Sequence, residues 1–335
     1  MKEKACFVGQ EGQINRVYRE MASVLKGELE FPAEVITLNN IEQYKDFAAE
    51  CKYIFTTWGM AKGFAEYFKK CEVVFYGAGS VQHFAREFLE RGVKVVSSWV
   101  ANGVPVAEVT ISQIILACKG FYQLSASGGV KNLQGWRDGG SLVGGNYKGN
   151  YNRKIGILGA GTIGRRVIDY LKRLEIKAEI LVYDPYYSDE AAAAAGVKKA
   201  SLEEVFWKCD VISNHIANLP ATVGMINKTH FALMKDYSTF INTGRGAQII
   251  EADMIDMLKN NKTIVALLDV TEPEPPVDTS ELYTLDNVIL TPHIAGCIGD
   301  EVLRMAEYMY NEYKLYSTEG KLNYEVTIEM LETMA

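Results

Sequence analysis

The chain of 335 residues is too long for one ordinary hydrophobic core and predicts two domains. Its composition, 48% hydrophobic and 23% charged, is typical of a globular protein, and a net charge of −7 without a basic run argues against nucleic acid or a membrane surface as a partner. It shows no signal-peptide pattern, no apolar run of about eighteen residues and no CxxC pair, so we expect a cytoplasmic protein with reduced cysteines and no metal site.

Short β-rich runs alternate with helical stretches through the first part of the chain. The predicted strands cover residues 5–9, 33–38, 52–57, 72–76 and 93–98, and the predicted helices include 14–25 and 82–92. Such alternation is typical of a parallel sheet wrapped by helices.

A predicted helix over 104–124 is followed by a glycine-rich stretch, 128–152, that lacks a clear period and predicts an irregular arm. A second βα series begins at Lys154, with six predicted strands at 154–158, 179–184, 210–216, 238–243, 263–270 and 287–292. Ser201 and Glu204 predict a capping box between two of these strands. A last predicted helix, 296–316, is expected to return and cover the first domain.

Three glycines, Gly159, Gly161 and Gly164, lie between the first strand of the second series and the helix after it. Gly159 allows a tight turn, Gly161 lets the backbone approach a pyrophosphate, and Gly164 lets the helix pack closely on the sheet. Asp184, at the end of the next strand, would accept hydrogen bonds from an adenosine ribose and repel a 2′-phosphate. The pattern predicts a dinucleotide site that favours NAD over NADP; the alternative is a glycine-rich turn that serves packing alone.

Arg245, Glu274 and His293 lie at or just after the ends of late predicted strands, where doubly wound sheets bind their ligands. Glycines on both sides of Arg245 leave its guanidinium free to reach a carboxylate. A carboxylate beside an imidazole orients the ring, and such a pair makes a proton donor. Each residue alone is more often structural, but beside a nicotinamide the three provide the groups that carbonyl reduction needs.

The motifs GAGTIGR, YDP, INTGRGA, LLDVTEPEP and ILTPHIAG occur in the order typical of the D-isomer-specific 2-hydroxyacid dehydrogenase family, which the chain resembles over nearly its full length. The resemblance implies an α/β fold with two doubly wound parallel sheets: a Rossmann NAD-binding domain, residues 102–293, inserted into a flavodoxin-like substrate domain, residues 1–101 and 294–335. It also implies NAD(H)-dependent interconversion of a 2-keto acid and a D-2-hydroxy acid, and a homodimer formed through residues 104–152.

Carried over by position, the resemblance implies that Arg245 binds the substrate carboxylate, His293 transfers the proton and Glu274 supports the imidazole. The cofactor residues that it implies, with Asp269 at the nicotinamide carboxamide, are Gly159, Gly161, Thr162, Ile163, Gly164, Asp184, Pro185, His215, Thr222, Thr243 and Asp269. The substrate residues that it implies are Trp58, Ala78, Gly79 and Asn102.

The chain departs from the family pattern at a few positions. Thr162 stands where many members have arginine, and HIANLPAT keeps His215 and Thr222 but lacks the first proline of the usual motif. The interval from Glu274 to His293 is short for the family. Glyoxylate or hydroxypyruvate reduction and a phosphoglycerate dehydrogenase-like activity remain alternatives among enzymes, and an NAD(H)-sensing, corepressor-like binding protein remains one outside them.

Overall fold

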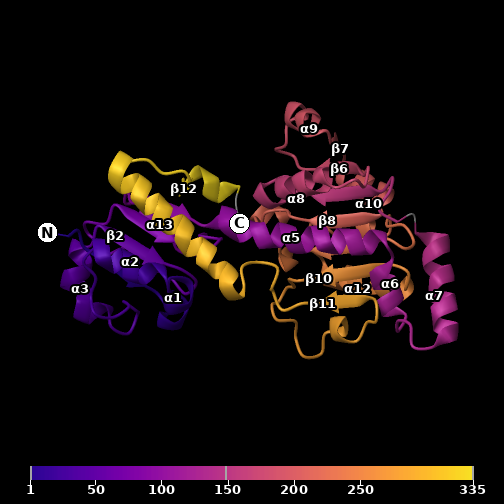
Figure 1. Cartoon of the computed structure of the whole chain (residues 1–335), viewed down its shortest axis with the longest axis horizontal. Coiled ribbons are helices and arrows are strands. Elements are labelled where there is room, and N and C mark those ends of the chain that lie inside the picture. The colour runs from indigo at the N-terminus through magenta and orange to yellow at the C-terminus, as the bar shows by residue number, and fades with distance from the viewer. Residues whose placement is uncertain (1, 148, 334–335) are drawn as a thin grey trace. The chain divides into compact units, whose positions relative to one another are not determined.

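A computed structural model describes residues 2–147 and 149–333 of the chain (Figure 1). The contacts divide the chain into two compact units. Unit 1 comprises Met1–Gly103 and Cys297–Ala335, and unit 2 comprises Val104–Gly296, so the boundaries lie slightly after those expected at residues 101 and 293. The chain enters unit 2 within helix α5, Trp99–Cys118.

Unit 1 is built on a five-stranded sheet with the order β1-β2-β3-β4-β12, in which only β12 runs antiparallel. The strands are β1 Ala5–Val8, β2 Tyr53–Thr56, β3 Val73–Tyr76, β4 Lys94–Ser97 and β12 Glu325–Val326. The strand predicted at 33–38 forms only an isolated parallel bridge from Ile36 to Val8, next to a second bridge from Glu30 to Lys4. This segment runs along the edge of β1 that does not pair with β2. Counted as the second strand of the unit, it completes the order 2-1-3-4-5, which is that of flavodoxin-like sheets.

Helices cover both faces of the unit 1 sheet. One face packs against α3 (Ile41–Glu50) and α4 (Ala85–Leu89), and the other against α1 (Glu11–Val17), α2 (Met21–Glu28) and α13 (Val302–Glu319). The helix predicted over 14–25 is therefore two helices. The C-terminal helix α13 returns to this unit as expected, and Tyr313 packs edge-on against Phe55 and Phe75 of the sheet.

Unit 2 contains a parallel sheet with the order β11-β10-β9-β8-β5-β6-β7. In chain order within the unit this is 7-6-5-4-1-2-3, the dinucleotide-binding arrangement extended by one strand. Its strands are β5 Lys154–Leu158, β6 Glu179–Tyr183, β7 Lys198–Lys199, β8 Val211–Asn214, β9 Thr239–Asn242, β10 Val265–Leu268 and β11 Val288–Leu290. Six of these were predicted; the two-residue strand β7, with both lysines exposed, was missed because it has no apolar pattern.

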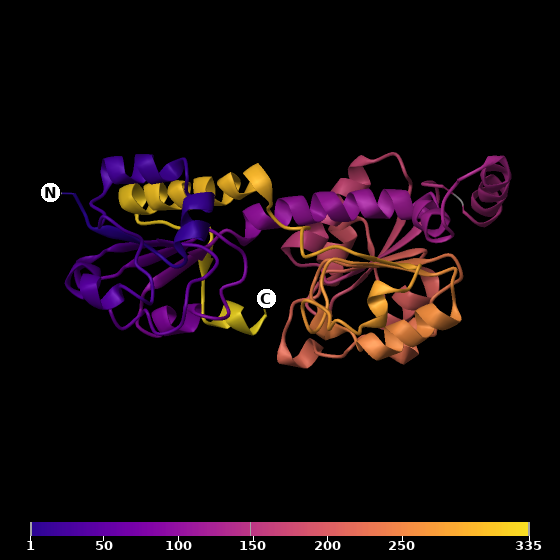
Figure 2. The same ribbon diagram turned by 90° about the horizontal axis from the view of Figure 1, so that it is seen from below.

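The sheet of unit 2 also has helices on both faces. Figure 2 shows α5 on one side and α12 on the other. The first face is covered mainly by α5, α6 Phe121–Ala126, α8 Thr162–Arg173 and α9 Asp189–Ala195, and the second by α10 Leu202–Lys208, α11 Lys228–Phe231 and α12 Glu251–Asn260. The predicted capping box at the start of α10 is present: Glu204 N donates to Ser201 Oγ at 3.1 Å and Ser201 N donates to Glu204 Oε2 at 3.2 Å.

The prediction of an irregular arm over 128–152 was wrong for most of its length, because Leu133–Asn146 form helix α7. Lys148 lies outside the described residues. Glycine lowers helix propensity, but α7 packs closely on α6: an added Cβ on Gly139 would lie 2.9 Å from Leu124 Cδ1 of α6. Tertiary contact thus overrides local propensity here.

One helix in the described part of the chain, α5, is long and apolar enough to pass a length-and-composition test for a membrane span. Its residues Ala107, Ile114 and Ala117 belong to the hydrophobic core of unit 2, and Thr110 is fully buried. These contacts identify α5 as a core helix of this unit.

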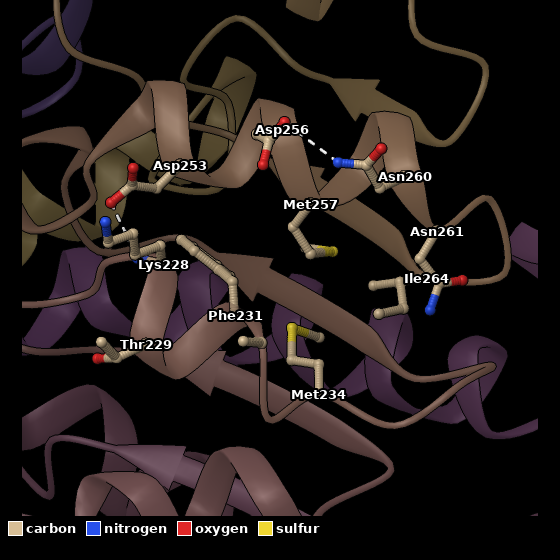
Figure 3. A pocket seen from close by; sticks show the side chains of 11 residues that line it. Lys228, Thr229, Phe231, Met234, Asp253, Asp256, Met257, Asn260, Asn261 and Ile264 are labelled. Carbon is tan, nitrogen blue, oxygen red and sulfur yellow. Dashed lines mark hydrogen bonds between the residues drawn. The ribbon is translucent and has the colours of Figure 1, made fainter.

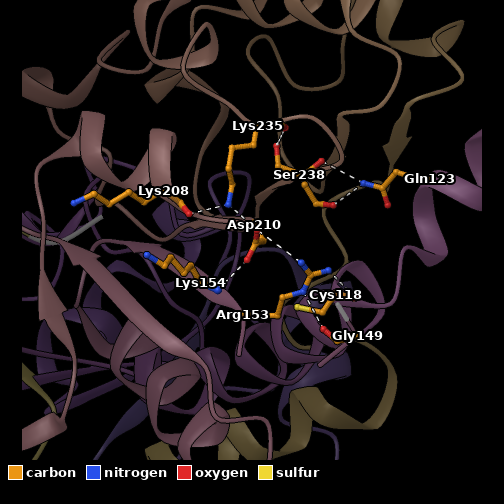
Figure 4. A network of polar contacts seen from close by, with 10 residues as sticks. Cys118, Gln123, Gly149, Arg153, Lys154, Lys208, Asp210, Lys235 and Ser238 are labelled. Carbon is orange, nitrogen blue, oxygen red and sulfur yellow. Dashed lines mark hydrogen bonds and ion pairs between the residues drawn. The ribbon is translucent and has the colours of Figure 1, made fainter. Parts of the chain in front are cut away.

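A charged network lies at the edge of the unit 2 sheet where its strands begin (Figure 4). Asp210 Oδ1 contacts Lys235 Nζ at 2.6 Å and Arg153 at 3.7 Å, and Asp210 Oδ2 accepts from Lys154 N at 3.0 Å. Arg153 also donates to the carbonyl oxygens of Cys118 and Gly149. The network therefore ties the end of α5 and the segment after α7 to the sheet.

Candidate active site

The candidate catalytic residues and most candidate cofactor residues follow strands of one sheet in unit 2. Arg245 follows β9, Asp269 follows β10 and His293 follows β11, and these three strands are neighbours. The glycine turn follows β5 and Asp184 follows β6. All of these strands are parallel, so the residues share the carboxyl edge of the sheet, where ligands of this fold class bind.

The glycine turn has the geometry that a pyrophosphate requires. Gly159 has a φ of +88°, and an added Cβ there would lie 2.7 Å from His215 O. An added Cβ on Gly164 would lie 2.0 Å from Gly159 O, whereas one on Gly161 would enter open space. Gly161 is the N-cap residue of α8 and provides no side-chain cap, so the first amides of this twelve-residue helix are available to an anion. These residues fit a bound dinucleotide.

Asp184 lies directly beside this turn. Its Oδ2 accepts from Ala160 N at 2.6 Å and its Oδ1 accepts from Tyr186 N at 2.8 Å. Each carboxylate oxygen has a second lone pair, so the side chain can still accept from a ribose hydroxyl. Thr162 and Pro185 are exposed next to the turn, and Ile163 is half-buried against the core of unit 2.

Three other candidate cofactor residues each have a polar side-chain atom engaged within the protein. Thr222 Oγ1 donates to Ala217 O at 2.7 Å within its own loop, and Thr243 Oγ1 lies 3.2 Å from Thr110 Oγ1 of α5. His215 Nε2 lies 2.9 Å from Ser213 Oγ, while its buried Nδ1 has no hydrogen-bond partner. Burial lowers the pKa of His215 to about 4, which keeps this imidazole neutral at neutral pH.

Glu274 and His293 form a direct pair. Glu274 Oε1 lies 2.6 Å from His293 Nδ1, and both side chains are a little under half exposed, at 40% and 46%. Because Nδ1 is occupied by the carboxylate, Nε2 is the ring nitrogen left to exchange a proton with a substrate. The interval from Glu274 to His293 is short for the family, but the two side chains still meet.

The backbone of the His293 loop is held by Asp269, which is 4% exposed. His293 has a φ of +53° and its N–H donates to Asp269 O at 3.0 Å. Asp269 Oδ1 accepts from Ile294 N at 2.9 Å and from Thr291 Oγ1 at 2.6 Å, and Oδ2 accepts from Ala295 N at 2.9 Å. A left-handed non-glycine residue persists only where its surroundings fix it, and these bonds provide that restraint.

The Arg245 side chain is bonded to its own loop. Its NH1 donates to Gly244 O at 2.8 Å, and the charge of Glu274 acts on its guanidinium. Burial lowers the pKa of Arg245 and the Glu274 carboxylate opposes that shift; an arginine nevertheless stays charged at neutral pH. The Glu274 carboxylate thus contacts the candidate histidine directly and acts on the candidate arginine only through its charge.

Sequence reasoning missed three fully buried amides, Asn214, Asn242 and Gln248, whose hydrogen bonds reach the backbone around Arg245. The only signal in the sequence was an asparagine near the end of each of two predicted strands, 210–216 and 238–243.

The four candidate substrate residues belong to unit 1. Ala78 N donates to Tyr76 O at 2.9 Å and Ala78 is fully buried, so we carry only the neighbouring Gly79 forward as a candidate amide donor. Asn102 Oδ1 accepts from Cys297 N at 3.0 Å, and its Nδ2 lies beside Gly79. Trp58 is half-buried between both cores of the unit, with the Arg16 guanidinium 6.0 Å from its ring.

A cavity of about 510 Å³ lies elsewhere in unit 2, between α11 and α12 (Figure 3). Its apolar wall includes Phe231, Met234 and Met257, and its rim includes Lys228 and Asp253. None of its lining residues belongs to the candidate catalytic, cofactor or substrate set, so we do not assign it to the reaction.

Comparison with known proteins identifies the family. Residues 124–295, slightly more than half of the chain, match the family model for the D-isomer specific 2-hydroxyacid dehydrogenase, NAD binding domain. The chain belongs to this family. The predictions of the family and of an NAD-binding domain are therefore confirmed.

Two relatives illustrate the sequence similarity. D-3-phosphoglycerate dehydrogenase of Archaeoglobus fulgidus is 34% identical over 216 residues, which are 64% of this chain and 39% of that protein. The putative 2-hydroxyacid dehydrogenase YoaD of Bacillus subtilis is 33% identical over 210 residues, which are 62% of this chain and 59% of YoaD. The matched segment thus spans 39% of the first relative and 59% of the second, less than two thirds of either.

Solved structures share the fold over nearly the whole chain. D-2-hydroxyisocaproate dehydrogenase matches with a TM-score of 0.74 and 22% identity, covering 97% of this chain and 99% of that one. D-mandelate dehydrogenase of Rhodotorula graminis matches with a TM-score of 0.78 and 22% identity, covering 97% and 98%. At this identity the likeness concerns the fold, and it confirms the predicted α/β class.

Proposed function

We propose that the protein is an NAD-dependent oxidoreductase that interconverts a 2-keto acid and a D-2-hydroxy acid. The observation that carries this proposal is the contact of 2.6 Å between Glu274 and His293, with Arg245 under the influence of the same carboxylate. These groups share one sheet edge with a glycine turn that fits a dinucleotide.

In this proposal each residue has a separate task. The planar fork of donors on the Arg245 guanidinium matches the two oxygens of the substrate carboxylate and binds them. The positive charge of the guanidinium also polarises the keto oxygen. His293 Nε2 donates a proton to the keto oxygen, and Glu274 stabilises the imidazolium at Nδ1. NADH, when bound, supplies the hydride for the carbonyl carbon. The reverse reaction uses neutral His293 to accept the hydroxyl proton.

The residues proposed to hold the cofactor fall into three groups along the chain. They are the turn glycines with Thr162 and Ile163, the pair Asp184 and Pro185 after β6, and the loops that carry His215, Thr222 and Thr243. Asp269, with three of its carboxylate lone pairs bonded to the His293 loop, has one left for a carboxamide donor. Asp184 favours NAD because its charge repels a 2′-phosphate. Removing that charge in Asp184→Ser should lower the ratio of kcat/KM for NADH over NADPH, and an unchanged ratio would contradict the assignment.

The proposed substrate residues are Trp58, Gly79 and Asn102 of unit 1. Candidate substrates include glyoxylate, hydroxypyruvate, phosphohydroxypyruvate and larger apolar 2-keto acids. We would follow the loss of NADH absorbance with each acid of this panel at a fixed enzyme concentration. The unmodified protein, Arg245→Ala and His293→Ala would be compared. We expect turnover of at least one acid, lowered by orders of magnitude in either variant. His293→Ala with near-normal turnover would refute the mechanism.

A binding protein that senses NAD(H) is the alternative function, and the same assay separates the two. Saturable NADH binding, measured by fluorescence, without turnover of any acid in the panel would support the alternative. The Glu274–His293 contact favours the enzyme, because binding a nucleotide needs no such proton donor.

We also propose that the protein is a homodimer in the cytoplasm. Large apolar side chains of α6 and α7 are exposed, including Phe121 at 52%, Leu133 at 64% and Trp136 at 67%, and such a surface favours a partner. All six cysteines are buried, which favours reduced thiols in a reducing compartment. Light scattering after gel filtration should give a dimer, and Leu133→Lys with Trp136→Lys should give a monomer. Trp207→Lys, an exposed tryptophan on α10, should stay dimeric.

A further inference from the structure

Three buried amides form a hydrogen-bonded cluster beneath the Arg245 loop, with Asn214 bonded to the other two. Asn214 and Asn242 are the last residues of neighbouring strands β8 and β9 and are partners in the sheet register. Asn214 Nδ2 donates to Asn242 Oδ1 at 3.0 Å and to Gln248 Oε1 at 2.8 Å. All three side chains are fully buried, so water cannot replace these bonds.

The cluster holds the backbone on both sides of the Arg245 side chain. Arg245 N donates to Gln248 Oε1 at 3.2 Å, and Arg245 O accepts from Asn242 Nδ2 at 3.0 Å. Gly244 N donates to Asn242 Oδ1 at 3.1 Å. The backbone donor and acceptor of Arg245 are therefore both fixed by side chains, which sets the direction in which its Cα–Cβ bond points.

The same cluster reaches the loop after β8. Ile216 N donates to Asn214 Oδ1 at 3.2 Å, and Ile216 O accepts from Gln248 Nε2 at 3.0 Å. The backbone of His215 and Ile216 lies against Gly159, where an added Cβ would be within 2.9 Å of both residues. A chain of close contacts thus runs from Arg245 to the glycine turn.

We propose that Asn214, Asn242 and Gln248 are positioning residues, which direct the Arg245 guanidinium and keep its loop in register with the loop beside the glycine turn. The inference deepens the proposed function, because it rests on Arg245 as the carboxylate-binding group. Loss of any amide leaves a buried backbone donor or acceptor unpaired, and the loop can satisfy that group only by moving. A displacement of about 1 Å at a substrate-positioning group can cost about 100-fold in rate.

Asn287 provides a matched control for a purely structural role. It is also a buried asparagine in unit 2, and its Nδ2 donates to the carbonyl oxygens of Leu258, Asn261 and Ile264. These partners lie before β10 begins, at the sheet edge opposite Arg245. Removing this amide should cost stability without touching the candidate site.

The kinetic test compares Gln248→Met with Asn287→Met in the full-length protein, using NADH and the best 2-keto acid of the panel. Both variants should lower the melting temperature. Gln248→Met should lower kcat/KM for the 2-keto acid by about 100-fold, and it should also raise the KM for NADH because it frees the loop beside the glycine turn. Asn287→Met should leave both constants near those of the unmodified protein. Equal kinetic effects of the two variants would overturn the proposal.

Hydrogen exchange tests the positioning without any turnover. The Arg245 amide should exchange at least about tenfold faster in Gln248→Met than in the unmodified protein or in Asn287→Met, because its acceptor is gone. An unchanged exchange rate at Arg245 would overturn the positioning role, whatever the kinetics. If the unmodified protein reduces no 2-keto acid, the proposed function fails, and the exchange rates still decide whether the cluster holds this loop.

Discussion

His293 Nδ1 and Glu274 Oε1 are 2.6 Å apart, and this contact selects which end of the imidazole faces a reactant. The two residues lie 19 positions apart, and they meet because the loop after β10 and the loop after β11 leave neighbouring strands at the same sheet edge. Under the proposed mechanism the carboxylate fixes the ring so that Nε2 faces the substrate, and the acid–base group is the pair rather than the histidine alone.

The first prediction concerns the charge of Glu274. Glu274→Gln keeps the shape of the side chain but removes the charge, and it should lower kcat for keto-acid reduction by about 10- to 100-fold. Glu272→Gln is the control, because Glu272 is an exposed glutamate in the same loop. Steady-state rates of both variants provide the measurement; equal activity of the two would remove Glu274 from the mechanism.

A second prediction separates binding glycines from packing glycines in the turn. Gly161→Ala adds a methyl group to open space, so its melting temperature should change little while its Kd for NADH rises by about tenfold or more. Gly164→Ala adds a methyl group 2.0 Å from Gly159 O and should lower the melting temperature clearly. Differential scanning fluorimetry and NADH fluorescence test the pair. Unaltered NADH affinity in Gly161→Ala would argue that the pyrophosphate does not lie over this turn.

A third prediction is a pH dependence of stability from His215. Burial lowers its pKa to about 4 in the folded protein, whereas an unfolded histidine titrates near pH 6.5. Between these values the unfolded chain binds more protons, so stability is complete above about pH 6.5 and falls as the pH drops toward 4, by up to about 3 kcal/mol.

The measurement is the melting temperature at pH 7.5 and pH 5. His215→Gln cannot bind the proton, so its melting temperature should fall less on acidification than that of the unmodified protein. His293→Gln serves as the control, since this ring is 46% exposed and its loss should leave the acid sensitivity in place. The same acid sensitivity in all three proteins would contradict a neutral, buried His215.

The sequence predicted those parts of the site in which a local residue pattern is combined with a general rule about where parallel sheets bind ligands. A strand, three spaced glycines and a helix identify the turn, and polar residues after parallel strands must share an edge, as Arg245 and His293 do. Helix α7 could not be predicted, because its glycines disfavour a helix and the packing of Gly139 on Leu124 is a tertiary contact.

The amide cluster escaped prediction for a related reason. Asn214 and Gln248 are 34 positions apart, and nothing local to either residue indicates a partner. A buried amide is recognised only when the groups that satisfy it are known, and here they are mostly backbone atoms of loops.

The last prediction concerns the charged network at the far edge of the unit 2 sheet. Burial acts to raise the pKa of Asp210, but the Lys154 amide and the charges of Lys235 and Arg153 outweigh it and hold the pKa below its usual range. Asp210→Asn leaves the nearly buried Arg153 without its counter-charge, and we expect it to destabilise the protein at pH 7 by about 2 kcal/mol.

Glu179→Gln is the matched control, because Glu179 pairs with Lys154 and Lys198 at 36% exposure and should contribute less than about 1 kcal/mol. A group with a depressed folded pKa stabilises the protein above its unfolded pKa, near 3.9, and this contribution is lost as the pH falls through the folded value. The stability difference between the unmodified protein and Asp210→Asn should therefore shrink in strong acid. A difference that persists unchanged at the lowest pH would mean that Asp210 stabilises the fold through its shape and hydrogen bonds rather than its charge.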